Sequence, residues 1–201
     1  MRTILFLILV IFSTRPAAAQ AEFDLNQMPL DWVGQIDTDK GITFMRFEGS
    51  ENRLFRFTYR VSTGTSEEQI EIWANANSQT VFARSGDVSI SFTPHDCWPS
   101  LGSCRYTKAY SNGSTEQYFT ETAMIGEIRH MQTFLSTASG PVLRTEECLL
   151  LDEFGFTKLS YRINHSTGEA GWGIARAGSG PQSQITVDQL AQTCSAPDRM
   201  S

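Results

Sequence analysis

Apolar and polar residues alternate along most of this chain, and this pattern predicts β-strands. In residues 53–61 the aromatic side chains at 55, 57 and 59 share one parity, and Arg56 and Arg60 share the other. Successive side chains of a strand point to opposite faces, so this segment predicts a half-buried strand with an aromatic inner face. The turn-forming residues 62–66 and the alternating residues 67–73 predict its antiparallel partner, with the glutamates of the second strand facing the arginines of the first.

The same alternation predicts a mainly β fold for the rest of the chain. Residues 20–31 form an irregular lead-in, and period-two patterning begins at Gly41. Asn112-Gly113 between two alternating segments predicts a tight hairpin. Many short strands with turns at short spacing favour an antiparallel sandwich or a small barrel. The further predicted strands are 80–84, 87–92, 104–110, 115–120, 143–151, 157–163 and 171–176.

Two segments are less regular. The apolar residues of 124–135 have helical spacing, but the same residues are also compatible with a strand, which the neighbouring strands favour. Near the C-terminus, Thr186 and Gln189 have the spacing of a capping box and predict a short helix. This helix would bring Cys194 back to the strand that contains Cys148.

The first 19 residues have the three-part pattern of a secretory signal peptide. Arg2 is followed by an apolar run at 4–12 and by three alanines at 17–19. A retained membrane anchor is the alternative, but this run is much shorter than the roughly 20 residues needed to span a bilayer. We therefore predict Sec-type export to the periplasm or the medium of a Gram-negative bacterium. Residues 20–201 would remain as one secreted β-rich domain with no stable membrane insertion.

Cleavage makes the mature chain more acidic. Loss of Arg2 and Arg15 reduces the 16 basic residues to 14 against 22 acidic residues, so the formal net charge falls from −6 to −8. A polyanion such as nucleic acid is a poor partner for such a surface.

Four cysteines remain in the exported chain, and four cysteines allow three pairings. We favour Cys97 with Cys104, because the segment between them is short and rich in turn residues, and Cys148 with Cys194. Zinc is the alternative. Zinc-binding cysteines usually occur as closer pairs, and an oxidising compartment favours disulfides. The cysteines are therefore predicted to be structural, with no metal and no cofactor.

The sequence lacks the common catalytic motifs. No histidine pair has metal-site spacing, and no serine-nucleophile, phosphate-loop or dinucleotide motif occurs. Adjacent carboxylates at 146–147 and 152–153 leave open a carboxylate-dependent hydrolase.

The residues between Cys97 and Cys104 are the best candidates for a binding role. A short disulfide-closed loop loses little entropy when it binds, and Trp98 and Leu101 are residues that contact partners well. Alternatively, Trp98 folds inward and covers the end of the sheet. The predicted function is a non-catalytic binding module for a protein, a glycan or a small ligand. A hydrolase and a structural or accessory envelope protein are the alternatives.

Overall fold

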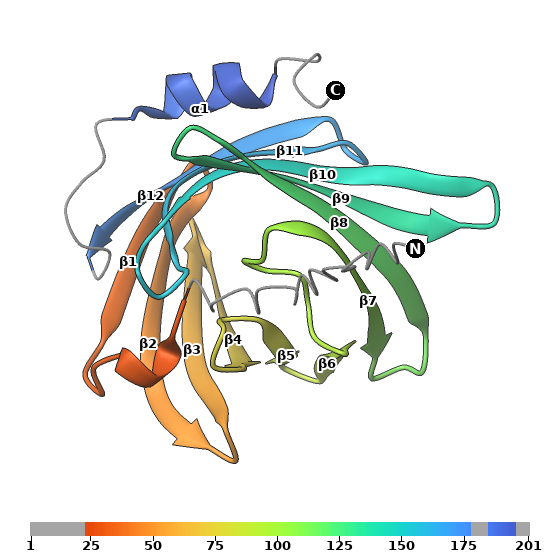
Figure 1. Ribbon diagram of the computed structural model, residues 1–201. Helices are drawn as coiled ribbons and strands as arrows, with labels where there is room; N and C mark the ends of the chain where they lie inside the picture. The colour runs from red at the N-terminus through yellow and green to blue at the C-terminus, as the bar shows by residue number, and fades with distance from the viewer. Residues whose placement is uncertain (1–22, 178–184, 196–201) are drawn as a thin grey trace, which may run out of the picture.

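The computed structural model describes residues 23–177 and 185–195; the predicted signal segment 1–19 lies outside the described residues. Short connections join its strands in sequence order (Figure 1). The elements are η1 (Leu25–Gln27), β1 (Val33–Thr38), β2 (Gly41–Glu51), β3 (Leu54–Thr63), β4 (Ser66–Ala74), β5 (Thr80–Ser85), β6 (Val88–Thr93), β7 (Gly102–Tyr110), β8 (Thr115–Ile125), β9 (Ile128–Thr137), β10 (Gly140–Leu151), β11 (Thr157–Asn164), β12 (Glu169–Ala177) and α1 (Val187–Cys194).

The strands form one closed antiparallel barrel. Each strand pairs with the next along the chain, and β1 pairs with β12 to complete the ring. The predicted mainly β fold is therefore confirmed, and of the two architectures proposed the barrel is the correct one. The α-helix lies outside the ring, across β10 and β11 (Figure 1). Neither helix in the described ranges is long and apolar enough to span a membrane.

Side chains alternate between the inside and the outside of the barrel. On β3, Phe55 and Phe57 face inward and are almost fully buried. Trp32 and Phe156 pack beside them, with the Trp32 and Phe156 rings stacked 4.8 Å apart and the Phe57 and Phe156 rings 5.1 Å apart. Burial of large aromatic side chains is a main source of stability, so this cluster anchors one end of the barrel.

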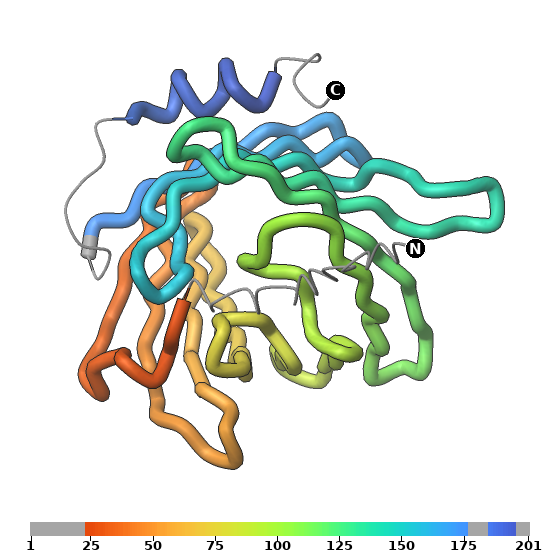
Figure 2. The backbone as a smooth tube through the Cα atoms, in the orientation of Figure 1, coloured from red at the N-terminus to blue at the C-terminus, as the bar shows by residue number. Residues whose placement is uncertain are grey.

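This end of the barrel is closed by connecting segments. Figure 2 shows the yellow-green segment between β6 and β7, which we call the disulfide loop (residues 94–101), crossing the interior of the ring. Its Trp98 Nε1 donates to the carbonyl of Gly155, 3.1 Å away, and its Ser100 hydroxyl accepts a hydrogen bond from Gln79. The Cys97–Cys104 disulfide ties the loop to β7. The opposite end carries short hairpin turns.

The second disulfide fastens α1 to the outer surface of the barrel. Cys148 on β10 is bonded to Cys194 at the end of the helix, and Leu190 is fully buried beneath it. The predicted capping box is present, since the Thr186 hydroxyl accepts from the Gln189 N–H and the Gln189 side chain accepts from the Thr186 N–H. Both predicted cysteine pairs are thus confirmed.

The structure resolves the uncertain segment and corrects two expectations. Residues 124–135 belong to β8 and β9, joined by a turn, so the strand interpretation is right and the helical one wrong. β1 lies where the sequence pattern indicated no strand. Glu71 lies opposite Thr58, and its ionic partner is Arg84 on β5 instead of an arginine of β3.

Gly41 is required at the turn between β1 and β2. Its φ is +154°, and a Cβ at this position would lie 1.9 Å from the carbonyl oxygen of Ser62. We expect Gly41→Ala to lower the free energy of unfolding by about 2–4 kcal/mol, because backbone must move and the conformation is strained. Gly64→Ala is the control: φ is +61° there, but the space is open, so a cost of about 1 kcal/mol is expected. Equal urea midpoints for the two variants would contradict this account.

Candidate functional site

The barrel encloses a cavity of about 600 Å³. A neighbouring space of about 530 Å³ shares several lining residues with it, among them Ile36, Trp98 and Arg162, so the two are lobes of one interior. Sites for small ligands commonly occupy a few hundred to a thousand cubic ångströms, so either lobe has the size of a ligand site. The cavity extends from the closed end to Ser166 in the turn between β11 and β12.

The part of the cavity nearest the closed end is aromatic and apolar. Trp98 from the disulfide loop and Phe156 from the β10–β11 connection contribute rings, and Phe57, Met45 and Met131 face inward from the strands. We call these five residues the aromatic floor. Flat rings and flexible thioethers fit apolar ligand groups of varied shape, so this floor suits the body of a small organic molecule.

A polar wall, which we define as Lys108 on β7 with Glu116 and Tyr118 on β8, lines the cavity above the floor. Glu116 accepts hydrogen bonds from the hydroxyls of Tyr110 and Tyr118, at 2.6 and 2.9 Å. These hydrogen bonds hold the pKa of Glu116 below its usual range, and the bond from Tyr110 has the larger effect. Attraction to the charges of Lys108 and Arg144 lowers the pKa further, by a smaller amount. Glu116 is therefore a charged acceptor whose Oε2 atom is engaged by two of the protein's own hydroxyls.

A second charged pair lies across the cavity, on β10 and β11. Glu147 Oε1 lies 3.1 Å from the Nε atom of Arg162. Burial raises the pKa of Glu147, and the charge of Arg162 offsets part of that increase. This side of the cavity therefore presents a paired carboxylate and a guanidinium whose side chain is about half exposed.

Asp96 is a buried carboxyl that also lines the cavity. Burial raises its pKa to about 7, although the amide of Thr80 donates a 2.8 Å hydrogen bond to its Oδ1. Burial likewise raises the pKa of Tyr59 and of Tyr106, so both phenols are neutral hydrogen-bonding groups at ordinary pH. Asp96 links the disulfide loop to β5 and thereby positions Trp98.

The structure separates the two predicted binding residues. Trp98 points into the barrel and forms part of the floor, whereas Leu101 is 48% exposed on the outside of the loop. The two therefore do not form one binding surface. Their role in binding a partner remains a prediction, and only Trp98 lies in the cavity.

The predicted carboxylate pairs are also separated. Glu146 and Glu147 are neighbours in a strand, so Glu146 faces outward and Glu147 faces the cavity. Asp152 is buried and accepts from the amides of Phe154 and Phe156, while Glu153 is exposed. Neither adjacent pair can place two carboxyl groups on one substrate.

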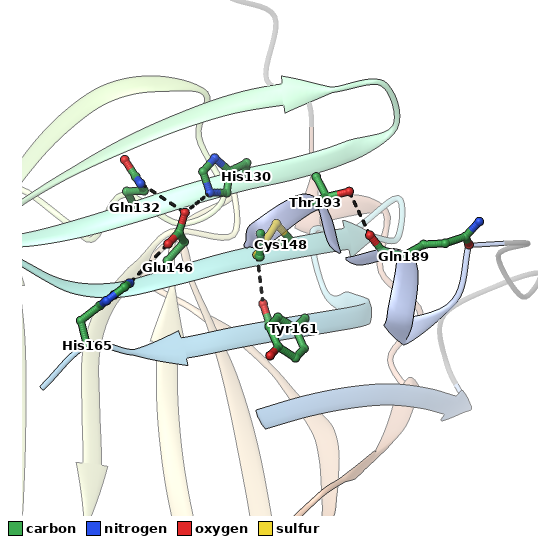
Figure 3. The surroundings of a disulfide bond; sticks show 9 residues. His130, Gln132, Glu146, Cys148, Tyr161, His165, Gln189 and Thr193 are labelled. Atoms are coloured by element: carbon green, nitrogen blue, oxygen red, sulfur yellow. Dashed lines mark hydrogen bonds and ion pairs between the residues drawn. A yellow bond between two sulfur atoms is a disulfide. The ribbon is translucent and has the colours of Figure 1, made fainter. Parts of the chain in front are cut away.

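Glu146 instead joins two histidines outside the barrel (Figure 3). Its Oε1 atom lies 2.7 Å from His130 Nε2, and its Oε2 atom lies 3.3 Å from His165 Nε2. One ring nitrogen of His130 and the sulfurs of Cys148 and Cys194 lie within 4.8 Å of one another. The sulfurs are joined in a disulfide, so they have no thiolate to offer a metal.

The polar wall was not predicted from the sequence, although one signal for it was present. Lys108 has the same parity as Tyr106 and Tyr110 in a segment that was predicted to be a strand. A charged residue on the aromatic face of a strand indicates a polar barrel interior.

Comparisons with models of protein families, with curated proteins and with solved structures found no match to this chain.

Proposed function

We propose that this protein binds a small ligand with an apolar or aromatic body inside its barrel. One observation carries the proposal: the middle of the closed ring holds a cavity of about 600 Å³ with an aromatic floor and a polar wall. A cavity in which apolar surface and a few polar groups converge is the usual form of a ligand site. The position of Trp98 in the floor favours a small ligand over a protein or a glycan.

The proposed setting is the periplasm or the medium outside the cell. The two disulfides are typical of an oxidising environment. The tripartite pattern at 1–19 supports Sec-type export from a Gram-negative cell.

Hydrolysis is the less supported function. Asp96 and Glu116 line the same cavity with pKa values shifted in opposite directions, as a general acid and a charged carboxylate would need. However, Asp96 accepts from the Thr80 amide, and Glu116 accepts from two tyrosine hydroxyls. Hydrogen bonds of this kind hold the disulfide loop and the side chains of the polar wall in place, so a structural role explains both carboxyl groups. Binding is therefore the better interpretation of the cavity.

Filling the cavity tests the proposal. Thr133 on β9 lines the cavity, and Thr133→Trp would occupy space beside the floor. The probe is phenylnaphthylamine, a neutral fluorophore that brightens in apolar surroundings. We expect saturable binding to the wild-type protein and at least about tenfold weaker binding to the variant, a loss of about 1.4 kcal/mol or more.

Thr107→Trp is the matched control, because Thr107 lies on β7 between two inward-facing residues and therefore faces outward. Its affinity for the probe should stay within about twofold of the wild type. Thr145→Trp, also in the cavity wall, replaces the first variant if circular dichroism shows that Thr133→Trp is unfolded. The proposal is wrong if the wild-type protein shows no saturable binding, or if a folded filled variant binds as well as the wild type.

A further inference from the structure

Lys108 places an ammonium group in the cavity without an acceptor. Within residues 23–177 and 185–195, this group has no hydrogen bond and no ion pair. Its Nζ atom lies 4.5 Å from the ring centroid of Tyr118 and 5.8 Å from that of Phe92. Aromatic faces attract a cation but do not accept its protons as an anion would.

Within the described residues, the nearby carboxylates attract this cation, but none forms a direct contact with it. Glu116 is near Lys108, but its Oε2 atom accepts from both tyrosine hydroxyls and no hydrogen bond or ion pair joins it to Lys108, while Glu147 is paired with Arg162. Burial lowers the pKa of Lys108; attraction to nearby carboxylates opposes this shift, and repulsion from Arg162 adds to it. An anion beside the ammonium group would replace lost hydration and reduce that repulsion.

A second cation that lines the cavity, Arg144 on β10, also lacks an anionic partner among the described residues. The Arg144 guanidinium lines the cavity, and its NH1 group donates to the neutral hydroxyl of Ser166, 2.8 Å away. Within the described ranges it forms no ion pair. Both cations contribute to lowering the pKa of Glu116, so both act on the same part of the cavity. This part of the cavity therefore holds two cations, Lys108 and Arg144, that no carboxylate of the described residues contacts directly.

We infer that the ligand carries one acidic group, which the Lys108 ammonium binds while the apolar body of the ligand lies on the aromatic floor. The inference rests on the proposed function and adds the charge of the ligand. The ligand class is thus a small monoanionic amphiphile. A neutral molecule of the same shape would bind but would leave Lys108 without an acceptor.

Two probes of nearly the same shape test this inference. Anilinonaphthalenesulfonate has the rings of phenylnaphthylamine and adds one sulfonate. At pH about 7, we expect the wild-type protein to bind the sulfonate probe at least about tenfold more tightly than the neutral probe. In Lys108→Met, which keeps the aliphatic stem, this ratio should fall to nearly one, while the affinity for the neutral probe changes by less than about twofold.

Lys158→Met is the matched control, since Lys158 lines neither lobe of the cavity and should keep the wild-type ratio. Lys108→Arg should retain a preference for the sulfonate probe, and Lys108→Gln replaces the methionine variant if that variant does not fold. Equal affinity of the wild-type protein for the two probes overturns the inference and leaves the proposed function standing. Unchanged ratios in folded Lys108 variants also overturn it. Loss of saturable binding of both probes would refute the proposed function itself.

Discussion

The free energy of unfolding is expected to fall as the pH rises from about 4 to about 7. Burial raises the pKa of Asp96 from 3.8 to about 7 and that of Asp152 to about 6, and it also raises that of Glu147. In the unfolded chain these carboxyls ionise near pH 4, whereas in the fold they keep their protons to higher pH. Their stabilising contribution is therefore complete below about pH 4 and is lost as the pH passes through the folded-state values.

The opposite dependence applies below this range. Hydrogen bonds lower the pKa of Asp24, Asp37 and Glu116, and stability from these groups is lost as the pH falls below their ordinary values. The carboxyl groups with raised pKa values and those with lowered pKa values together place maximum stability near pH 4–5. The shift at Asp96 corresponds to at most about 4 kcal/mol, and an overall decrease of about 2–4 kcal/mol between pH 5 and pH 8 would lower Tm by about 5–15 °C.

Thermal unfolding at a series of pH values measures this effect. Asp96→Asn removes the titrating group but keeps an oxygen that can accept from the Thr80 amide, so the variant should lose most of the decrease in Tm between pH 5 and pH 8. Asp87→Asn, in the exposed turn between β5 and β6, should retain the wild-type profile. A Tm that is constant or rises over this interval in the wild-type protein would contradict this account of the buried carboxyls.

Local sequence patterns predicted the individual strands well. Alternation is imposed by the geometry of a strand with one buried face, and it therefore marks β3 and β4 without knowledge of their neighbours. The capping box at Thr186 is also local, because both of its hydrogen bonds join residues three apart. The pairing of Cys97 with Cys104 follows from the same locality, since a short turn-rich segment can close on itself.

Closure of the barrel could not be predicted in this way. β1 contains Gly34 and Asp37 and has little apolar alternation, so its sequence resembles a loop. It is nevertheless the strand that pairs with β12, more than 130 residues later in the chain, and without it the choice between sandwich and barrel stays open. Long-range pairing of this kind depends on the whole sheet rather than on the strand that completes it.

The candidate site could not be predicted from local sequence patterns either, because its geometry also depends on contacts between distant segments. The direction of Trp98 depends on a hydrogen bond to Gly155, which lies 57 residues away in the chain. The pairing of Glu147 with Arg162 depends on the register between β10 and β11. Only the inward parity of Lys108 could be read from its own strand.

Removal of the Cys148–Cys194 disulfide should have the largest effect on stability of any change considered. The two residues are 46 apart, and in the chain-entropy model a loop of this length contributes about 4 kcal/mol. Removing the bond by Cys148→Ala with Cys194→Ala also leaves α1 held only by the packing of residues such as Leu190. The midpoint of urea unfolding should therefore fall strongly, and it can be followed by circular dichroism.

The Cys97–Cys104 disulfide should behave differently, because its loop lies inside the barrel. With a separation of 7 residues it contributes only about 2.5 kcal/mol by the same model, but it holds the loop that places Trp98 in the floor. Replacing both cysteines with alanine should weaken binding of phenylnaphthylamine more than the outer double variant does, while the outer variant loses more stability. At urea concentrations below both midpoints both variants are folded, so the loss of probe binding can be measured separately from the loss of stability. If the outer variant lost probe binding as severely as the inner one, the α1 side of the barrel would belong to the site, and the assignment of binding to the cavity would have to be revised.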